Sequence, residues 1–352
     1  MIIYVLLLFM ILLLFPLQWK KRTLLNGTIV TINNKEYIHI ISFILIIFLG
    51  LRGLSVGIDT KNYYDMFNDI KQLNLLQTLN VNFEHGYQLL EFFIGRIFGR
   101  FQFLLVFVAI LYIGTVSYYI YKYSSNPMIS YILFIGFGFY SFAMSSTRQT
   151  LAISFTMIAY KYIKEKNISK YLLFILIAST FHISALIFLP CYWLNKINLN
   201  RKKLLLILFL ALALFAFKDS LRILLNNFAR IVYQPTQTGG NRMYFLMVFS
   251  TILGVIYIKP FIQKNENNKY LFYMMVGSTL IMPITQFNPT IMRLNYYFFI
   301  FMIIYIPNLL SVIKDKFIRI IGTLGYSLVG IIWFFTSSIS VQQLETYKFF
   351  WK

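Results

Sequence analysis

The chain has 352 residues, of which 59% are hydrophobic, 19% are aromatic and only 12% are charged. Soluble domains carry about 25% charged residues, so this composition excludes a water-soluble globular fold and indicates an integral membrane protein. The net charge of +21 is spread over short loops, which is typical of positively charged cytoplasmic loops and not of a nucleic-acid-binding domain. The single cysteine, Cys191, excludes a disulfide within the chain and a cysteine-based metal site.

A helix that crosses the hydrocarbon core of a membrane needs about 20 apolar residues. The candidate windows are continuously apolar, which favours helices over the alternating strands of a barrel. We therefore predict a single all-α membrane domain over residues 1–352, with about 10 to 11 transmembrane helices and a GT-C-like architecture as one option. The windows lie near 2–18, 37–51, 102–121, 127–143, 148–163, 171–193, 203–217, 243–262, 270–284, 292–312 and 318–340. The first window lacks a basic leader and a cleavage site, so we interpret it as a retained span.

Loop charges predict the orientation, because Lys and Arg favour the cytoplasmic side. Loops 19–36, 161–170 and 313–319 each carry more basic than acidic residues, and we place them in the cytoplasm. Loop 51–100 has equal numbers of basic and acidic residues, and we place it outside. Within it, residues 60–72 and 86–100 have the apolar spacing of amphipathic helices.

A second outer loop is predicted at residues 218–242, with a further amphipathic helix at 220–233. The window at 171–193 is ambiguous. If it crosses the membrane fully, the basic residues at 196–203 fall outside; if it turns back near Thr180–Ser184, every basic loop lies inside. We favour the re-entrant version, and a missed span between 204 and 241 is the alternative.

Three arginines from distant segments are predicted to meet at the outer face: Arg52, Arg148 and Arg293. Arg offers forked donors that suit phosphate oxygens and stays charged when it is desolvated. A diphosphate head group is the expected ligand. The alternative for each Arg is that it extends to the interface and anchors a span. Arg148 stands in "SSTRQTLAIS", where small polar residues favour a binding turn at a helix N-terminus.

Four residues near this face are candidate proton acceptors: Asp59, Glu84, His85 and His182. The alternative is that Asp59 caps the helix beginning at Thr60, that Glu84 and His85 cap the next helix, and that His182 is a structural hydrogen-bond donor. The sequence contains no H-E-x-x-H motif, P-loop or G-x-G-x-x-G, so we expect no metal and no nucleotide cofactor.

Five segments resemble the EpsG family, which is similar to the O-antigen polymerases called Wzy. In chain order they are "RGLSVGIDTKNYYDMF", "FEHGYQLLEFFI", "SSTRQTLAISFTMIAYKYI", "ASTFHISALIFLPCYWL" and "IMRLNYYFFIFMIIYIP". The resemblance runs from about residue 50 to 310. It implies a multi-pass polysaccharide polymerase of the bacterial inner membrane, whose site faces the periplasm or cell exterior. The family's Arg, Asp and His positions would correspond to Arg52, Asp59, Arg148, Gln149, His182 and Arg293.

Such enzymes transfer a growing glycan from undecaprenyl diphosphate to the non-reducing-end sugar of a new lipid-linked unit. They work beside a flippase and a chain-length regulator. We expect the arginines to stabilise the departing diphosphate. As general base, Asp59 and His182 rank above Glu84 and His85. Gln149 and the rings of Tyr63, Tyr64 and Tyr87 are expected to bind the sugars, with interface anchoring as the alternative for each Tyr. Other activities to consider are a glycan ligase with another acceptor and a flippase or transporter, although we find no repeated halves that would suit a transporter.

Overall fold

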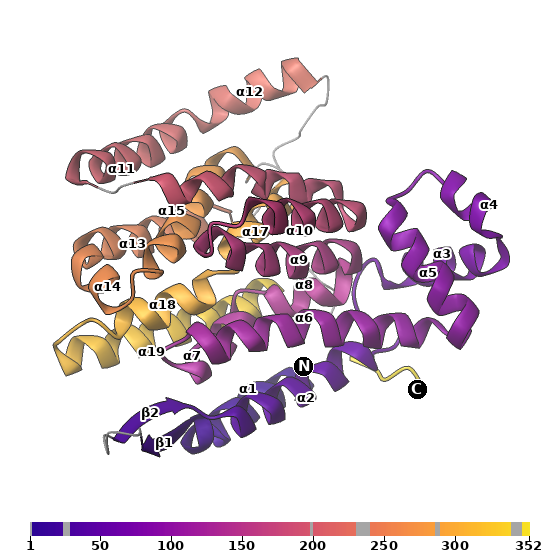
Figure 1. Ribbon diagram of the computed structural model, residues 1–352, viewed down its shortest axis with the longest axis horizontal. Helices are drawn as coiled ribbons and strands as arrows, with labels where there is room; N and C mark the ends of the chain where they lie inside the picture. Colours follow the sequence, from indigo (N-terminus) through magenta and orange to yellow (C-terminus); the bar gives the residue numbers. More distant parts are fainter. Residues whose placement is uncertain (1, 24–28, 198–199, 230–239, 286–288, 339–346) are drawn as a thin grey trace.

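The computed structural model is helical throughout except for one two-stranded sheet (Figure 1). It describes residues 2–23, 29–197, 200–229, 240–285, 289–338 and 347–352. Most of the long helices run along the long axis of the molecule. We call the end that carries residues 52–100 the loop end, and the end that carries the two strands the hairpin end; they lie at the right and left of Figure 1.

A short β-hairpin connects the first helices of the chain, and it was not predicted from the sequence. Loop 19–36 forms strands β1 and β2, which pair antiparallel with Trp19 opposite Asn33, and this hairpin is the one sheet in the described part of an otherwise helical chain. The run Ile29-Val30-Thr31-Ile32 explains the strand, because β-branched residues favour extended backbone. The elements are α1 (Ile2–Leu13), η1 (Phe15–Gln18), β1 (Trp19–Thr23), β2 (Ile29–Asn33) and α2 (Lys35–Gly50).

Three short helices make up the loop end: α3 (Thr60–Gln72), α4 (Leu75–Asn80) and α5 (His85–Phe98). The first and third confirm the helices predicted at 60–72 and 86–100. The middle helix was not predicted, although Asn74 and Gln77 form a capping box at its start. Gly99 ends α5 with a φ of 71°, a left-handed conformation that glycine adopts without strain.

A long apolar helix leads from the loop end to the hairpin end. This helix, α6 (Phe101–Tyr123), has 23 residues, which corresponds to about 34 Å. The window predicted at 127–143 is broken into α7 (Pro127–Gly136) and α8 (Phe139–Ser145), which meet at 48°. The chain then runs back through α9 (Thr147–Lys164), so that the N-terminus of α9 lies at the loop end.

The ambiguous segment reverses direction at His182. Helix α10 (Ile168–Phe181) runs antiparallel to α9, and the 3-10 helix η2 (Ile183–Lys196) returns along both. The rings of Phe155 and Phe181 stack at 5.3 Å, and those of Tyr171 and Tyr192 lie 5.3 Å apart. Both ends of the segment therefore lie toward the hairpin end, as the re-entrant prediction required. Helices α10 and η2 each run along most of α9, so the segment is a long helical hairpin and not a short re-entrant turn.

The C-terminal half of the chain adds further helices, several of which are bent. Helix α12 partly confirms the helix predicted at 220–233; positions 230–239 of that prediction and of the outer loop at 218–242 lie outside the described residues. The elements are α11 (Arg201–Ala216), α12 (Lys218–Ala229), α13 (Gly240–Ile256), α14 (Ile258–Lys264), α15 (Asn268–Thr285), α16 (Pro289–Met292), η3 (Arg293–Asn295), α17 (Tyr296–Phe299), α18 (Met302–Leu310), α19 (Lys316–Trp333) and η4 (Phe334–Ser338).

Several helices are suited to cross a membrane. Within the described residues, 3 helices are long and apolar enough, or up to 6 if each bent pair counts as one span. The unbent ones are Phe101–Tyr123, Arg293–Leu310 and Lys316–Thr336. This supports the membrane class. It also shows that many predicted windows are short, bent or split, so the predicted windows are not all single straight helices.

Helices α7 and α19 approach each other backbone to backbone at Gly136. A Cβ added there would lie 2.7 Å from the carbonyl carbon of Gly330. We expect Gly136→Ala to lower the free energy of unfolding by about 1–3 kcal/mol, because the helices must separate. Gly114→Ala on α6 is the control: no atom lies within 4 Å of its added Cβ, so we expect stabilisation of roughly 0.5–1 kcal/mol. Thermal unfolding in detergent measures both, and equal stability of the two variants would contradict the packing.

Candidate functional site

The Glu84 carboxylate connects three separate segments at the loop end. Its Oε1 lies 2.7 Å from Nδ1 of His182, and its Oε2 accepts a hydrogen bond from Nη1 of Arg148. Glu84 directly precedes α5, Arg148 stands in the first turn of α9, and His182 occupies the reversal between α10 and η2. One carboxylate thus brings together a base and a cation that lie far from it in the sequence.

The backbone around Glu84 and His182 leaves both side chains available for these contacts. Glu84 occupies the N-cap position of α5, but its side chain makes no capping hydrogen bond. His182 is extended, with φ −161° and ψ 117°, and therefore interrupts the helix. The capping role considered for Glu84 is therefore not observed.

The electrostatics keep Glu84 ionised. Burial acts to raise its pKa, but the hydrogen bonds and charges of His182 and Arg148 outweigh burial and lower the pKa to about 2. Between 18% and 28% of the Glu84, Arg148 and His182 side chains is exposed. The cluster is therefore partly shielded from water yet open to a ligand.

Two aromatic rings hold the Arg148 guanidinium in place. Its Cζ lies 3.9 Å from the ring centroid of Phe83, and its Nε lies 3.5 Å from the hydroxyl of Tyr63. A cation above an aromatic face is attracted by the ring quadrupole. Sequence reasoning missed Phe83, although its position directly before Glu84 was a usable signal.

The second arginine joins the cluster through the backbone. Nε2 of Gln149 donates to the Arg293 carbonyl at 2.8 Å, and Nη1 of Arg293 lies 3.9 Å from Oδ2 of Asp59. Asp59 precedes α3 without making a capping hydrogen bond. The turn before it depends on Gly57, with φ 92°, where a Cβ would lie 2.1 Å from the Met144 carbonyl oxygen. Only glycine fits this approach of loop and helix.

Arg52 is not part of this cluster. It is 1% exposed, and its Nη1 donates to the Leu49 carbonyl at the end of α2. The C-terminal segment covers it: Gly53 N–H donates to the Lys348 carbonyl at 2.8 Å, and Phe350 N–H donates to the Leu51 carbonyl at 3.0 Å. Among the described residues Arg52 forms no ion pair or hydrogen bond with the other site residues.

Three other predicted site residues point elsewhere. Nδ1 of His85 pairs with Oε1 of Gln88 at 3.2 Å, within its own helix. The ring of Tyr64 packs against Phe101. Tyr87 is fully buried, and its ring lies 5.5 Å from that of Tyr63. Of the three tyrosines, only Tyr63 contacts the cluster directly.

A buried acid behind the cluster was not predicted. Glu91 is 0% exposed, one helical turn beyond Tyr87 on α5. Burial raises the pKa of Glu91 to about 9, so it is protonated at neutral pH. It lies on the buried face of α5 with Tyr87, Gln88 and Ile94. Glu84 and Glu91 therefore hold opposite protonation states seven residues apart in the chain.

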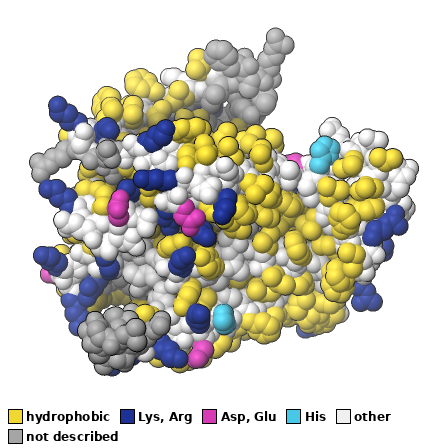
Figure 2. Space-filling view, in the orientation of Figure 1, with side chains coloured by type: hydrophobic (Ala, Val, Ile, Leu, Met, Phe, Trp, Pro, Cys, Tyr) yellow, Lys and Arg dark blue, Asp and Glu magenta, His cyan; other side chains and the backbone are white. Residues whose placement is uncertain are grey.

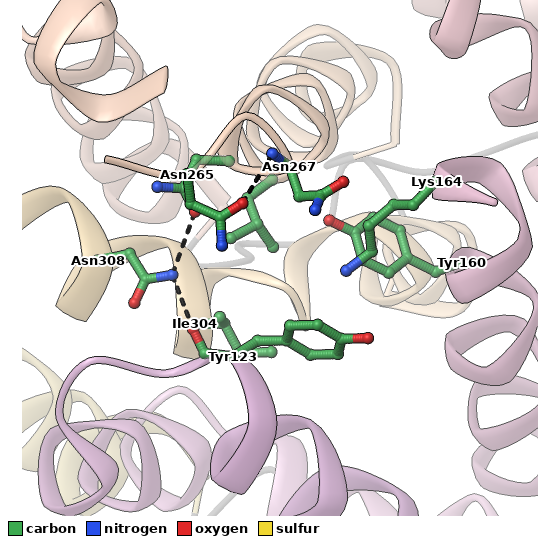
Figure 3. Close-up of a pocket in the computed structure, with 9 residues that line it drawn as sticks. Tyr123, Tyr160, Lys164, Asn265, Asn267, Ile304 and Asn308 are labelled. Carbon is green, nitrogen blue, oxygen red and sulfur yellow. Dashed lines mark hydrogen bonds between the residues drawn. The ribbon is translucent and has the colours of Figure 1, made fainter. Parts of the chain in front are cut away.

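A separate polar pocket lies at the other end of α9 (Figure 3). Lys164 Nζ stands 3.5 Å from the ring centroid of Tyr123, and Asn308 donates to the Tyr123 carbonyl at 2.8 Å. The 18 residues of α9 separate it from Arg148 by about 25 Å. Its volume of about 10 Å³ fits one water molecule and not a sugar. The lining residues are Tyr123, Tyr160, Lys164, Asn265, Asn267, Asn268, Leu271, Ile304 and Asn308.

The pKa of Glu84 predicts a pH-dependent stability. Because this pKa falls from 4.5 to about 2 on folding, ionised Glu84 stabilises the fold fully above pH 4.5, and this stabilisation is lost as the pH falls toward 2. We expect Glu84→Gln to unfold at a lower temperature than the wild type at pH 7, with the difference shrinking below pH 4.5. Asp69→Asn, on the exposed face of α3, is the control. A difference independent of pH would contradict the ion-pair account.

One known protein family matches most of this chain. The family model described as the EpsG family matches residues 35–351, which include every residue of the Glu84 cluster. No curated protein matches the chain significantly. No solved structure matches it significantly either. The match confirms the resemblance of the five segments, and the chain therefore belongs to the EpsG family, which indicates a polymerase-like role in polysaccharide biosynthesis.

Proposed function

We propose that the protein is a membrane glycosyltransferase that extends a polysaccharide. It transfers the growing glycan from undecaprenyl diphosphate to the non-reducing-end sugar of a lipid-linked repeat unit. The observation that carries this proposal is the Glu84 carboxylate between His182 and Arg148. This arrangement sets a proton acceptor beside a cation, and glycosyl transfer from a diphosphate needs both. Family membership supports the same class of reaction.

His182 is the proposed general base. Its Nδ1 is held by Glu84 at 2.7 Å, which leaves Nε2 to accept the proton of the acceptor hydroxyl. Glu84 itself is a poor base, because its low pKa means that it binds a proton weakly and because both of its oxygens are engaged. Asp59 ranks below His182, because it lies near Arg293 and neutralises part of its charge. His85 ranks below His182, because its Nδ1 pairs with Gln88 within its own helix and not with Glu84.

Arg148 and Arg293 are the proposed diphosphate ligands. As the hydroxyl oxygen bonds to the anomeric carbon, the bond to the phosphate oxygen breaks and its electron pair leaves with the diphosphate. Fixed cations stabilise this charge strongly in a partly shielded site. Arg52 is buried beneath residues 347–350. We therefore propose that Arg52 stabilises the packing of this segment and does not contact the ligand. Gln149 and Tyr63 border the same space.

The proposed orientation follows the charges. The hairpin end carries the basic loops 161–170 and 313–319 together with β1, and positive loops favour the cytoplasm. The loop end then faces the periplasm or cell exterior, where lipid-linked repeat units arrive after a flippase has moved them. The protein would lie in the bacterial inner membrane, beside a chain-length regulator.

Removal of His182 should abolish polymerisation. We expect His182→Ala to slow chain extension by about 100- to 10,000-fold, the usual effect of losing a general base. His85→Ala is the matched control, because this imidazole pairs with Gln88 within its own helix. The assay supplies purified protein with synthetic lipid-linked repeat units and resolves product length by electrophoresis. Equal loss in both variants would contradict the assignment.

Arg148→Ala separates a polymerase from a flippase. We expect long glycans to disappear, through a loss of about 100- to 1,000-fold in rate, while single repeat units still reach the cell surface. Arg100→Ala, an exposed arginine at the start of α6, should leave the ladder of chain lengths intact. Loss of all exported glycan in Arg148→Ala cells would favour a flippase. A normal ladder would remove Arg148 from the site.

A further inference from the structure

A groove at the hairpin end has the size of a ligand site. Its volume is about 610 Å³, within the roughly 300–1,000 Å³ that small-molecule sites occupy. It lies between the strands, the end of α6 with the link that follows it, and the last residue of α14. The lining residues are Trp19, Ile32, Asn33, Tyr121, Lys122, Ser124, Ser125 and Lys264.

The groove is positively charged. Nζ of Lys122 bonds to the Tyr118 hydroxyl at 3.0 Å, and Nζ of Lys264 bonds to the Ser311 hydroxyl at 2.8 Å. Among the described residues, neither ammonium forms an ion pair with a carboxylate. Lys20 and Lys21 are exposed on β1 beside Trp19. Figure 2 shows Lys and Arg side chains gathered toward this end of the molecule. The charge therefore favours an anionic ligand.

The walls of the groove are fixed by hydrogen bonds. The side-chain amide of Asn33 donates to the carbonyls of Tyr121 at 2.9 Å and Ser124 at 2.8 Å. Ser125 N–H donates to Oδ1 of Asn308 at 2.8 Å, and the buried Ser125 hydroxyl has no partner among the described residues. The hairpin is thus fastened to the link between α6 and α7, and the groove is formed before a ligand arrives.

An apolar strip leads to the rim of the groove. On and after α1, Leu12, Leu13, Phe15 and Leu17 are between 41% and 61% exposed. The strip ends at Trp19, which is 40% exposed and lies 6.0 Å from the ring of Phe15. Trp at the end of an apolar helix is typical of the level of lipid head groups. A ligand with a phosphate and two acyl chains would match both the groove and the strip, whereas a soluble phosphate would use only the groove.

We propose that this groove binds the head group of an anionic phospholipid from the membrane leaflet at the hairpin end. Lys122 and Lys264 contact the phosphate, and the acyl chains lie along the exposed face of α1. Basic pockets beside transmembrane helices bind anionic head groups in this way. The site lies at the opposite end of α6 from the Glu84 cluster, so it does not depend on the proposed polymerase activity.

The test measures lipid binding to the purified full-length protein in detergent. Phosphatidylglycerol, phosphatidylcholine and inorganic pyrophosphate are titrated separately, and bound lipid is counted by native mass spectrometry alongside thermal unfolding. We expect phosphatidylglycerol to bind and to raise the unfolding temperature, and the double variant Lys122→Gln/Lys264→Gln to bind it about tenfold or more weakly. The variant must elute as a single species and unfold within a few degrees of the lipid-free wild type.

The control removes the same charge from the same end of the molecule. Lys314→Gln/Lys316→Gln changes two exposed lysines outside the groove, and phosphatidylglycerol binding should change less than about twofold. Equal weakening in both double variants would overturn the site in favour of diffuse charge. Equal binding of phosphatidylcholine would overturn the role of the anion, and equal binding of pyrophosphate would overturn the assignment to a lipid.

Discussion

The shared carboxylate of Glu84 is the interaction on which the loop end depends. It joins the turn before α5, the first turn of α9 and the reversal at His182. Because each of its oxygens holds one partner, the position of the imidazole is coupled to that of the guanidinium. Substitutions at these three residues should therefore be strongly non-additive. Without the carboxylate, a half-buried cation would lack its counter-charge, which is costly.

Composition and loop charges predicted much of the architecture. The apolar windows indicated a helical membrane domain, and the amphipathic spacing correctly identified α3 and α5. The reversal at His182 was expected from charge alone. The breaks at residues 137–138, 217 and 257 were not predicted. At the first of them Gly138 has a φ of 82°, a left-handed conformation that ends the helix. The β-hairpin was missed because a polar loop with basic residues was interpreted only as a connection.

The candidate site was predictable as a set of residues but not as a geometry. Distant motifs supplied Arg148, His182, Arg293 and Asp59, and the structure brings them together. No sequence signal indicated that Glu84 would be the link, since a carboxylate before a helix usually caps it. Arg52 resembled the other arginines in sequence, and its burial next to the C-terminal segment, where it pairs with Phe349, was not apparent from the sequence. Glu91 illustrates the same limit, because burial and not residue type determines its protonation.

The pairing of the C-terminal segment with residues 51–53 also has a consequence for biosynthesis. Tyr347 donates to the Phe48 carbonyl across 299 residues of sequence, and Phe350 bonds to Leu51. A chain emerges from the ribosome N-terminus first, so the contacts that cover Arg52 form later than those among the segments that precede residue 347. Arg52 can therefore reach its fully buried state only after residues 347–350 have been synthesised.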